Sequence, residues 1–235
     1  MAIYMWRELP NYLCFTANTA GSTVALQRNW SPTAVTLETS TDWVNWTTYT
    51  INTTIVLSNI WDKLYWRNTS TTDTSFGLSN SAYYQFVMNW SIAASWDIWY
   101  LLNKNSTTTM YSYCFFGLFL GCTSLKMPPK LPATTLANNC YDEMFANCTN
   151  LEWLPALPSL ALVEKCYYYM FYGCSKIKIS YNQTWDYQTP YRIPTTWTAT
   201  ETWASTTYYM FTNTWWPYAT TPSKNTTYYT SNTVV

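Results

Sequence analysis

A repeat with a period of 26 residues, between Met110 and Ile179, constrains this chain more than any other feature. Cys114, Cys140 and Cys166 mark the period, and three more columns of similar residues keep the same spacing. Repeats of this length predict stacked units, each of which buries its apolar face against the next. The other columns are Cys122, Cys148 and Cys174, then Phe119, Phe145 and Phe171, and finally Leu125, Leu151 and Ile177.

Each repeat carries the spacing of an amphipathic helix. Apolar residues stand four apart, as from Leu136 through Cys140 and Met144 to Cys148. Such spacing predicts a helix with one buried face. One column near the end of each predicted helix holds only Gly or Asn, which most readily adopt the left-handed conformation of a helix C-cap. The predicted caps are Gly121, Asn147 and Gly173.

A short alternating segment follows each predicted helix, at residues 125–127, 151–153 and 177–179. Alternation of apolar and polar residues predicts a strand, and stacked repeats would pair these strands in parallel. Opposite charges then alternate along the outer side, which stabilises neighbouring strands slightly. That outer column is Lys126, Glu152 and Lys178.

The repeats resemble the BspA-type leucine-rich repeats of surface proteins from gut and oral bacteria and of phage-associated proteins. The resemblance covers about the central third of the chain, and implies a right-handed solenoid with a role in adhesion or recognition and without catalysis. The segments that carry it are Phe119 to Leu125, Leu131-Pro132, Cys140 to Leu151, Leu157-Pro158 and Cys166 to Ile177.

Residues 1–105 have the pattern of a β-domain. Short runs rich in β-branched and aromatic residues are separated by turn-forming residues, as in an antiparallel sandwich. The predicted fold class is therefore α+β: a β-sandwich-like domain over residues 1–105, then a leucine-rich-repeat solenoid over residues 106–235 with one helix and one short strand per turn. The predicted strands are Tyr12 to Phe15, Thr23 to Leu26, Ala34 to Glu38, Trp46 to Ile51, Thr54 to Leu57, Lys63 to Arg67 and Tyr84 to Met88.

The repeat continues irregularly toward the C-terminus. The motif Tyr-Tyr-Met-Phe of residues 168–171 returns at residues 208–211, after 40 residues instead of 26. This predicts an inserted segment at residues 180–207 and one degenerate turn. The tail at residues 214–235 is expected to be a terminal strand that covers the open end, because an uncovered last turn exposes core and strand edge.

Composition points away from nucleic acid and from membrane insertion. Basic and acidic residues balance at 12 each, only 10% of residues are charged, and no apolar run has the length of a membrane span. Residues 1–10 lack the features of a secretory signal. The chain is expected at a cell surface, outside the cell or in a virion, as part of a secreted protein or as one released without a signal; the oligomeric state stays open.

The residues predict no catalytic, metal or cofactor site. The chain has no His and no Cys-x-x-Cys pair, so that a zinc site is not expected. The six cysteines of the repeat are expected to be buried thiols, and Cys14 stands alone. Acidic residues fall at turns or on a predicted helix, where a structural role is expected. These are Asp42, Asp62, Asp73, Asp97, Asp142 and Glu143.

Tryptophan stands where turn chemistry favours glycine. The chain has 15 Trp and 5 Gly, and several Trp follow Asn, Asp or Ser in turn-like contexts. Turns of this type need positive φ, which Trp resists. We hypothesise that many of these Trp correspond to a UGA codon that is read as Gly in the source; a genuinely aromatic surface is the alternative. The positions include Trp30, Trp43, Trp90, Trp96 and Trp215.

Three tyrosines, Tyr168, Tyr169 and Tyr172, fall off the apolar stripe and are the candidate recognition surface. Exposed Tyr provides contact area at low entropic cost. Packing against residues 180–207 is the alternative. The expected function is non-enzymatic recognition of a host-surface protein or glycan by a bacterial surface or virion protein. The other hypotheses are a carbohydrate-binding module and a purely structural virion component.

Overall fold

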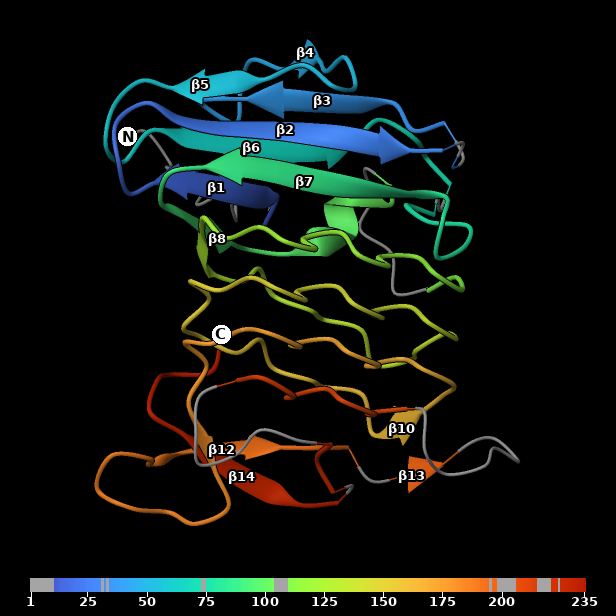
Figure 1. The fold of residues 1–235 in the computed structure, drawn as a ribbon. Helices are drawn as coiled ribbons and strands as arrows, with labels where there is room; N and C mark the ends of the chain where they lie inside the picture. Colours follow the sequence, from blue (N-terminus) through green and yellow to red (C-terminus); the bar gives the residue numbers. More distant parts are fainter. Residues whose placement is uncertain are drawn as a thin grey trace, which may run out of the picture.

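The fold is that of a computed structural model, which describes residues 11–30, 32, 34–72, 75–103, 110–194, 196–197, 206–214, 221–223 and 225–235. Three regions follow one another along one axis (Figure 1): two packed sheets, a stack of coils, and smaller sheets at the other end. The elements are β1 (Leu13–Ala17), β2 (Ser22–Asn29), β3 (Leu37–Ser40), β4 (Thr47–Thr48), β5 (Ile55–Leu57), β6 (Lys63–Asn68), β7 (Tyr83–Asn89), β8 (Ile92–Ser95), the 3-10 helix η1 (Ile98–Leu101), β9 (Leu125–Met127), β10 (Ala161–Leu162), β11 (Ile179–Ser180), β12 (Thr189–Arg192), β13 (Thr196–Trp197) and β14 (Thr227–Thr230).

Strands β1 to β7 lie where the sequence predicts them. One sheet has the order β4-β3-β6-β1-β8-β9, and a second has the order β5-β2-β7. Their inner faces meet through aromatic rings: Phe86 lies 4.9 Å from Phe15 and 5.2 Å from Trp66 between ring centroids. Alternate residues of β6 and β7 are buried, as expected of strands that face a core on one side.

The two sheets continue directly into the first repeat. Strand β8 pairs in parallel with β9, and the amide of Phe86 donates to the carbonyl of Leu118 at 2.8 Å. One hydrophobic cluster extends from Leu13 to Tyr228. The predicted boundary between the two domains, at residues 105 and 106, lies in residues 104–109, outside the described residues. The residues before this boundary and the residues after it belong to one hydrophobic core.

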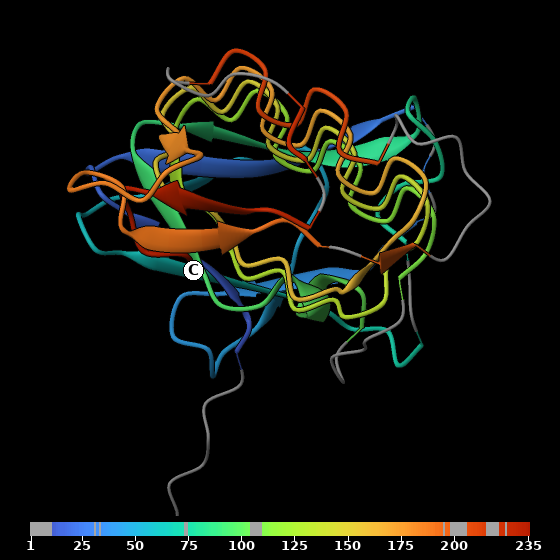
Figure 2. The same cartoon turned by 90° about the horizontal axis from the view of Figure 1, so that it is seen from below.

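The α+β fold class and the helical leucine-rich-repeat solenoid are wrong. The described residues contain no α-helix; the repeats are coils of successive turns, and the structure is nearly all β. Of the three segments predicted as strands, 125–127 is β9, 151–153 is not a strand, and only the end of 177–179 joins β11. In Figure 2 the coils of the three repeats overlie one another when seen along the axis.

Backbone hydrogen bonds explain how coils replace helices. Every second amide donates to a carbonyl of the following coil, as from Phe119 to Met144 at 2.8 Å and from Phe145 to Met170 at 3.0 Å. The amides between them close tight turns within the coil, as from Leu120 to Gly117 at 2.9 Å. The buried backbone therefore finds its partners without a helical ladder.

A left-handed residue at every fourth position makes this pattern possible. Gly121, Asn147 and Gly173 have φ of 70°, 61° and 71°, so that their predicted left-handed conformation is confirmed, but they do not cap helices. Two further residues of each coil have the same left-handed conformation, and such residues interrupt an α-helix. They are Tyr113 and Gly117, Asn139 and Glu143, and Lys165 and Tyr169; Tyr209 and Asn213 continue the pattern in a fourth coil.

A ladder of phenylalanine rings runs through the stack. Phe119 and Phe145 are 5.4 Å apart, Phe145 and Phe171 are 5.6 Å apart, and each pair of rings is nearly parallel. Phe86 of β7 extends the ladder at one end by 5.3 Å, and Phe211 extends it at the other by 5.5 Å. Each coil thus covers the apolar ring of the next, as the predicted column of Phe requires.

The cysteine columns are buried thiols, and their predicted burial is confirmed. All seven cysteines are free and buried. Burial raises the pKa of the Cys148 thiol well above its ordinary value. In the second column each thiol donates to a Phe carbonyl of the preceding layer: Cys122 to Phe86 at 2.9 Å, Cys148 to Phe119 at 3.0 Å and Cys174 to Phe145 at 3.0 Å.

The C-terminal segment closes the stack. Strand β14 lies between β11 and β12 in an antiparallel sheet, and β10 pairs with β13. The chain then returns to the coils (Figure 1), where the amide of Val235 donates to the carbonyl of Leu154 at 2.9 Å. The tail therefore contains the predicted terminal strand.

The tryptophan turns have the backbone that the sequence predicts for glycine. Trp30, Trp43, Trp90 and Trp96 have φ of 53°, 54°, 65° and 64°. Trp61, which the sequence does not single out, has φ of 72°. The predicted Trp215 lies outside the described residues.

Candidate recognition surface

Tyr168, Tyr169 and Tyr172 lie on the outer side of the third coil, each partly exposed. Their neighbours Tyr167, Met170 and Phe171 turn inward and are buried. A left-handed residue turns the backbone at every fourth position. Pairs of side chains therefore alternate along the coil, with one pair buried and the next pair on the outside. The sequence prediction that the three tyrosines leave the apolar stripe agrees with these exposures.

The three rings form one cluster with the next coil. Tyr168 packs edge-on against Tyr169 at 4.4 Å, and Tyr169 packs against Tyr172 at 5.1 Å. Tyr168 stacks on Tyr208 at 6.1 Å, and Tyr169 contacts Tyr209 at 5.0 Å. We call these five residues the tyrosine surface. These ring contacts are made within the third coil and with the fourth. The alternative, packing against residues 180–207, falls in part on residues 195–205, most of which lie outside the described residues.

Hydrogen bonds hold the tyrosine surface in place. The hydroxyl of Tyr208 donates to that of Tyr209 at 2.8 Å, and the amide of Tyr169 donates to the carbonyl of Tyr208 at 3.0 Å. Partial burial, followed by the neighbouring Tyr169, raises the pKa of Tyr168 to about 12. The Tyr168 hydroxyl is therefore neutral at physiological pH and can donate or accept a hydrogen bond.

An acidic pair borders the tyrosine surface. Asp142 and Glu143 belong to the coil before it, and the amide of Glu143 donates to the carbonyl of Tyr168 at 2.9 Å. Asp142 is buried with one carboxylate oxygen lacking a hydrogen-bond partner, and burial raises its pKa to about 8. Lys165 lies over the Tyr168 ring at 5.5 Å. The tyrosine surface is thus bordered by the Lys165 cation and by two acidic side chains, of which Asp142 is protonated at neutral pH.

The other acidic residues have structural roles in turns. Two backbone amides, of Val44 and Asn45, donate to Asp42. Asp62 accepts the amide of Asn59 at 2.8 Å, and Asp97 caps η1 through the amide of Trp99 at 2.7 Å. Asp73 lies outside the described residues. The structure brings none of the other three, Asp42, Asp62 and Asp97, to the tyrosine surface.

The described residues form neither a metal-binding cluster nor a membrane-spanning helix. Within the described part of the chain, no group of three or more His, Cys, Asp or Glu side chains could hold a metal ion. Over the same residues, no helix has the length and apolar character needed to cross a bilayer.

No protein-family profile, no curated protein and no solved structure matches this chain. The resemblance to BspA-type repeats therefore has no support beyond the residues that suggested it, and its helical solenoid is not observed.

Sequence reasoning missed two members of the tyrosine surface. Tyr208 and Tyr209 belong to it because the fourth coil stacks on the third, with the amide of Phe171 donating to the carbonyl of Met210 at 3.0 Å. The return of Tyr-Tyr-Met-Phe at residues 208–211 was the signal that could have found them. It indicates an equivalent place in the stack despite the inserted residues.

Proposed function

We propose that the chain is a non-enzymatic recognition protein of a bacterial cell surface or a virion, which binds a host-surface protein or glycan through the tyrosine surface. The observation that carries the proposal is the contiguous cluster of five partly exposed tyrosines on two neighbouring coils. Tyrosine is enriched in recognition sites because it offers a rigid apolar ring and a hydroxyl at low entropic cost.

The rigidity of the stack supports this proposal. The tyrosines sit on coils that are tied to each other by backbone hydrogen bonds every second residue, and the Phe171 ring beneath them stacks on Phe211 at 5.5 Å. A surface held in place before binding loses little entropy when it binds. The low content of charged residues, at 10%, also favours an extracellular or virion protein over a cytosolic enzyme.

The test replaces Tyr168, Tyr169 and Tyr172 together with Ser and measures binding to a glycan array and to an array of extracellular protein domains. We expect the unaltered chain to bind a defined class of target saturably. The triple variant should lose at least about 2 kcal/mol of binding free energy, as expected when a cluster of aromatic contacts is removed.

Tyr111→Ser is the matched control, because Tyr111 is 45% exposed in the first coil and lies outside the tyrosine surface. Its binding should equal that of the unaltered chain. Both variants should keep the same melting temperature. A target bound equally by the triple variant, or the absence of any saturable target on both arrays, contradicts the proposal.

A further inference from the structure

Five tryptophans within residues 30–96 have a left-handed backbone, with φ between 53° and 72°. In this region the Cβ of an L-residue crowds its own backbone, and glycine alone enters it freely. Bulky residues are found there only rarely. Four of the five Gly of the chain also have positive φ. The five tryptophans, which we call the turn tryptophans, are Trp30, Trp43, Trp61, Trp90 and Trp96.

The turn tryptophans stand apart from the other left-handed residues. In the repeat coils, hydrogen bonds between coils hold residues such as Glu143 and Tyr169 at positive φ. Outside the coils, the left-handed residues other than Gly in the described part of the chain are Asn52, Asn225 and the turn tryptophans. Asn enters this region readily, because its short polar side chain can hydrogen-bond locally. Trp has no such reason to be there.

The turn at Trp61, between β5 and β6, has the geometry that requires glycine. The amide of Asp62 donates to the carbonyl of Asn59 at 3.3 Å, which closes a four-residue turn with Trp61 at its third position. Positive φ at the third position alone, here 72°, defines a type II turn, where Gly or Asn is needed. The amide of Trp61 also donates to the carbonyl of Ala17 at 2.8 Å, which fixes this backbone.

The other four turn tryptophans each follow a residue that precedes Gly in tight turns. Asn-Gly and Asp-Gly are preferred pairs because Gly supplies the positive φ. At Trp43 the preceding Asp42 accepts the amides of Val44 at 2.9 Å and of Asn45 at 2.7 Å, so that the turn is set by local hydrogen bonds. The four pairs are Asn29-Trp30, Asp42-Trp43, Asn89-Trp90 and Ser95-Trp96.

Trp90 and Trp96 lie on either side of the short strand β8. Trp90 belongs to the connection by which the chain passes from β7 in one sheet to β8 in the other. The carbonyl of Trp96 accepts the amide of Lys130 at 2.8 Å, and the amide of the next residue, Asp97, donates to the carbonyl of Asn11 at 3.1 Å. The chain therefore changes direction between backbone hydrogen bonds, where a residue without Cβ is favoured.

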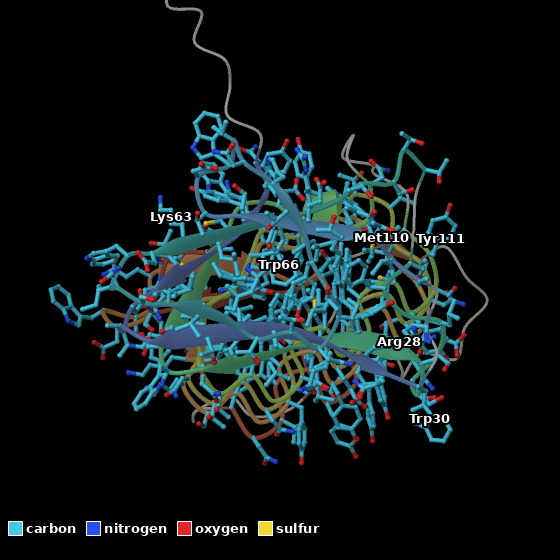
Figure 3. The ribbon with its side chains drawn as sticks, turned by 90° about the horizontal axis from the view of Figure 1, so that it is seen from above. Arg28, Trp30, Lys63, Trp66, Met110 and Tyr111 are labelled. Atoms are coloured by element: carbon cyan, nitrogen blue, oxygen red, sulfur yellow. The ribbon has the colours of Figure 1, made fainter. Side chains whose placement is uncertain are left out.

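The side chains of the turn tryptophans contribute little to the fold. Their exposed fractions are 84%, 41%, 71%, 67% and 43% in chain order. By contrast, Trp66 and Trp99 are 0% and 2% exposed, and the Trp66 ring lies 4.6 Å from that of Tyr49. Figure 3 shows the difference: Trp66 lies within the packed interior, whereas Trp30 projects from the rim. Two populations of tryptophan are therefore present.

A binding platform of aromatic rings is the alternative reason for exposed tryptophans, and it needs rings that lie together. The seven residue pairs of the β2–β7 ladder lie between Trp30 at one end and Trp90 at the other. Strand β8 in turn separates Trp90 from Trp96. The turn tryptophans are thus distributed over several turns, which does not suit one platform.

We infer that the five positions of the turn tryptophans are glycine in the protein made by its source, through a UGA codon read there as Gly. The chain has 15 Trp and 5 Gly, whereas proteins average about 7% Gly. A UGA codon that means Gly, when translated as Trp, produces this excess and this deficit together. The turn tryptophans are separate from the tyrosine surface, so that the inference goes beyond the proposed function and does not rest on it.

The codons of the gene test the inference directly. UGA is expected at the five positions of the turn tryptophans, and UGG is expected at the core residues Trp66 and Trp99. UGG at the five turn positions would overturn the inference. UGA at Trp66 and Trp99 as well would also overturn it, because the source would then read UGA as Trp in the core.

The melting temperature of the purified chain gives a second test. Each change of a turn tryptophan to Gly should raise it by roughly 2 °C, since relief of backbone strain stabilises a domain of this size by that order. Trp185→Gly is the matched control, because Trp185 is 88% exposed but does not have positive φ. Its melting temperature should not rise, and Trp66→Gly should melt lower. No rise in any turn variant, or an equal rise for Trp185→Gly, would contradict the inference.

Discussion

The thiol of Cys148 donates a hydrogen bond to the carbonyl oxygen of Phe119, one coil earlier, at 3.0 Å. The Phe119 carbonyl also accepts the amide of Cys122 at 3.0 Å, so that the thiol supplies its second bond. The Phe column and the second Cys column of the repeat therefore act together. The ring of each Phe stacks on the ring of the next, and the carbonyl of each Phe accepts a hydrogen bond from the thiol of the following coil. This explains why Cys and Phe recur together.

Two variants, Cys148→Thr and Cys148→Val, should distinguish the contribution of the Cys148 hydrogen bond to stability from the contribution of its packing. The two side chains have nearly the same shape, but only Thr can donate, and Thr214 occupies the equivalent place in the fourth coil. We expect Cys148→Thr to be more stable than Cys148→Val by about 0.5–1.5 kcal/mol in urea unfolding. Equal stability, or a more stable Val variant, would show that the thiol acts only through its volume.

Two glycines in one column of the repeat, Gly121 and Gly173, provide a second matched pair. Gly121 and Gly173 have φ of 70° and 71°, but a Cβ at Gly121 would meet open space, whereas one at Gly173 would clash with Oδ1 of Asn147. Gly121→Ala should therefore cost about 1–2 kcal/mol from backbone strain alone, and Gly173→Ala should cost more. Thermal unfolding of both variants measures the difference, and an equal loss would mean that Asn147 moves aside freely.

Asp142 should make the protein less stable at alkaline pH. Its pKa in the folded protein is raised from 3.8 to about 8 by burial, so that folding favours the protonated acid. Its contribution is complete below about pH 4 and is lost as the pH rises through about 8. Asp142→Asn should flatten this decline, which urea titrations across that range would measure as several kcal/mol of lost pH dependence.

Asp42 supplies the opposite control for that measurement. Backbone amides, first that of Asn45, lower the pKa of Asp42, so that its contribution is present at neutral pH and is lost as the pH falls. Asp42→Asn should therefore weaken the protein at neutral pH and have little effect in strong acid. If Asp42→Asn and Asp142→Asn changed the pH profile in the same direction, the assignment of Asp142 would be wrong.

The sequence predicted strands β1 to β7 and the columns of the core because both depend on local patterns. Alternating residues such as those of Lys63–Asn68 leave little choice but a half-buried strand. A period of 26 residues predicted that Phe119, Phe145 and Phe171 would stack, and their rings do. The joining of both halves into one core could not be read locally.

The helices could not be distinguished from coils by spacing alone. Leu136, Cys140, Met144 and Cys148 are four residues apart, which suits one face of a helix and equally suits a turn repeated every four residues. The difference lies in Glu143 and Tyr169, which are left-handed although neither residue type favours that backbone. Hydrogen bonds to the neighbouring coils select this conformation, and a single repeat contains no sign of them.

The sequence predicted three of the five residues of the tyrosine surface, because their exposure follows from the pattern within one coil. Tyr168, Tyr169 and Tyr172 were chosen as residues off the apolar stripe, and they are partly exposed. Tyr208 and Tyr209 join them only through stacking of the fourth coil, after an insertion of irregular length. Contacts between coils, and not the residues of one coil, define the extent of the surface.

The backbone conformation of residues 136–148 tests the central claim most directly, because a helix and a coil of turns differ there at every fourth residue. Nuclear magnetic resonance of the labelled chain would measure it through chemical shifts and three-bond couplings. We predict positive φ at Asn139, Glu143 and Asn147, and slow exchange of the Phe145 amide, which donates to Met170 at 3.0 Å. Uninterrupted α-helical shifts from Leu136 to Cys148 would contradict the stacked-coil structure.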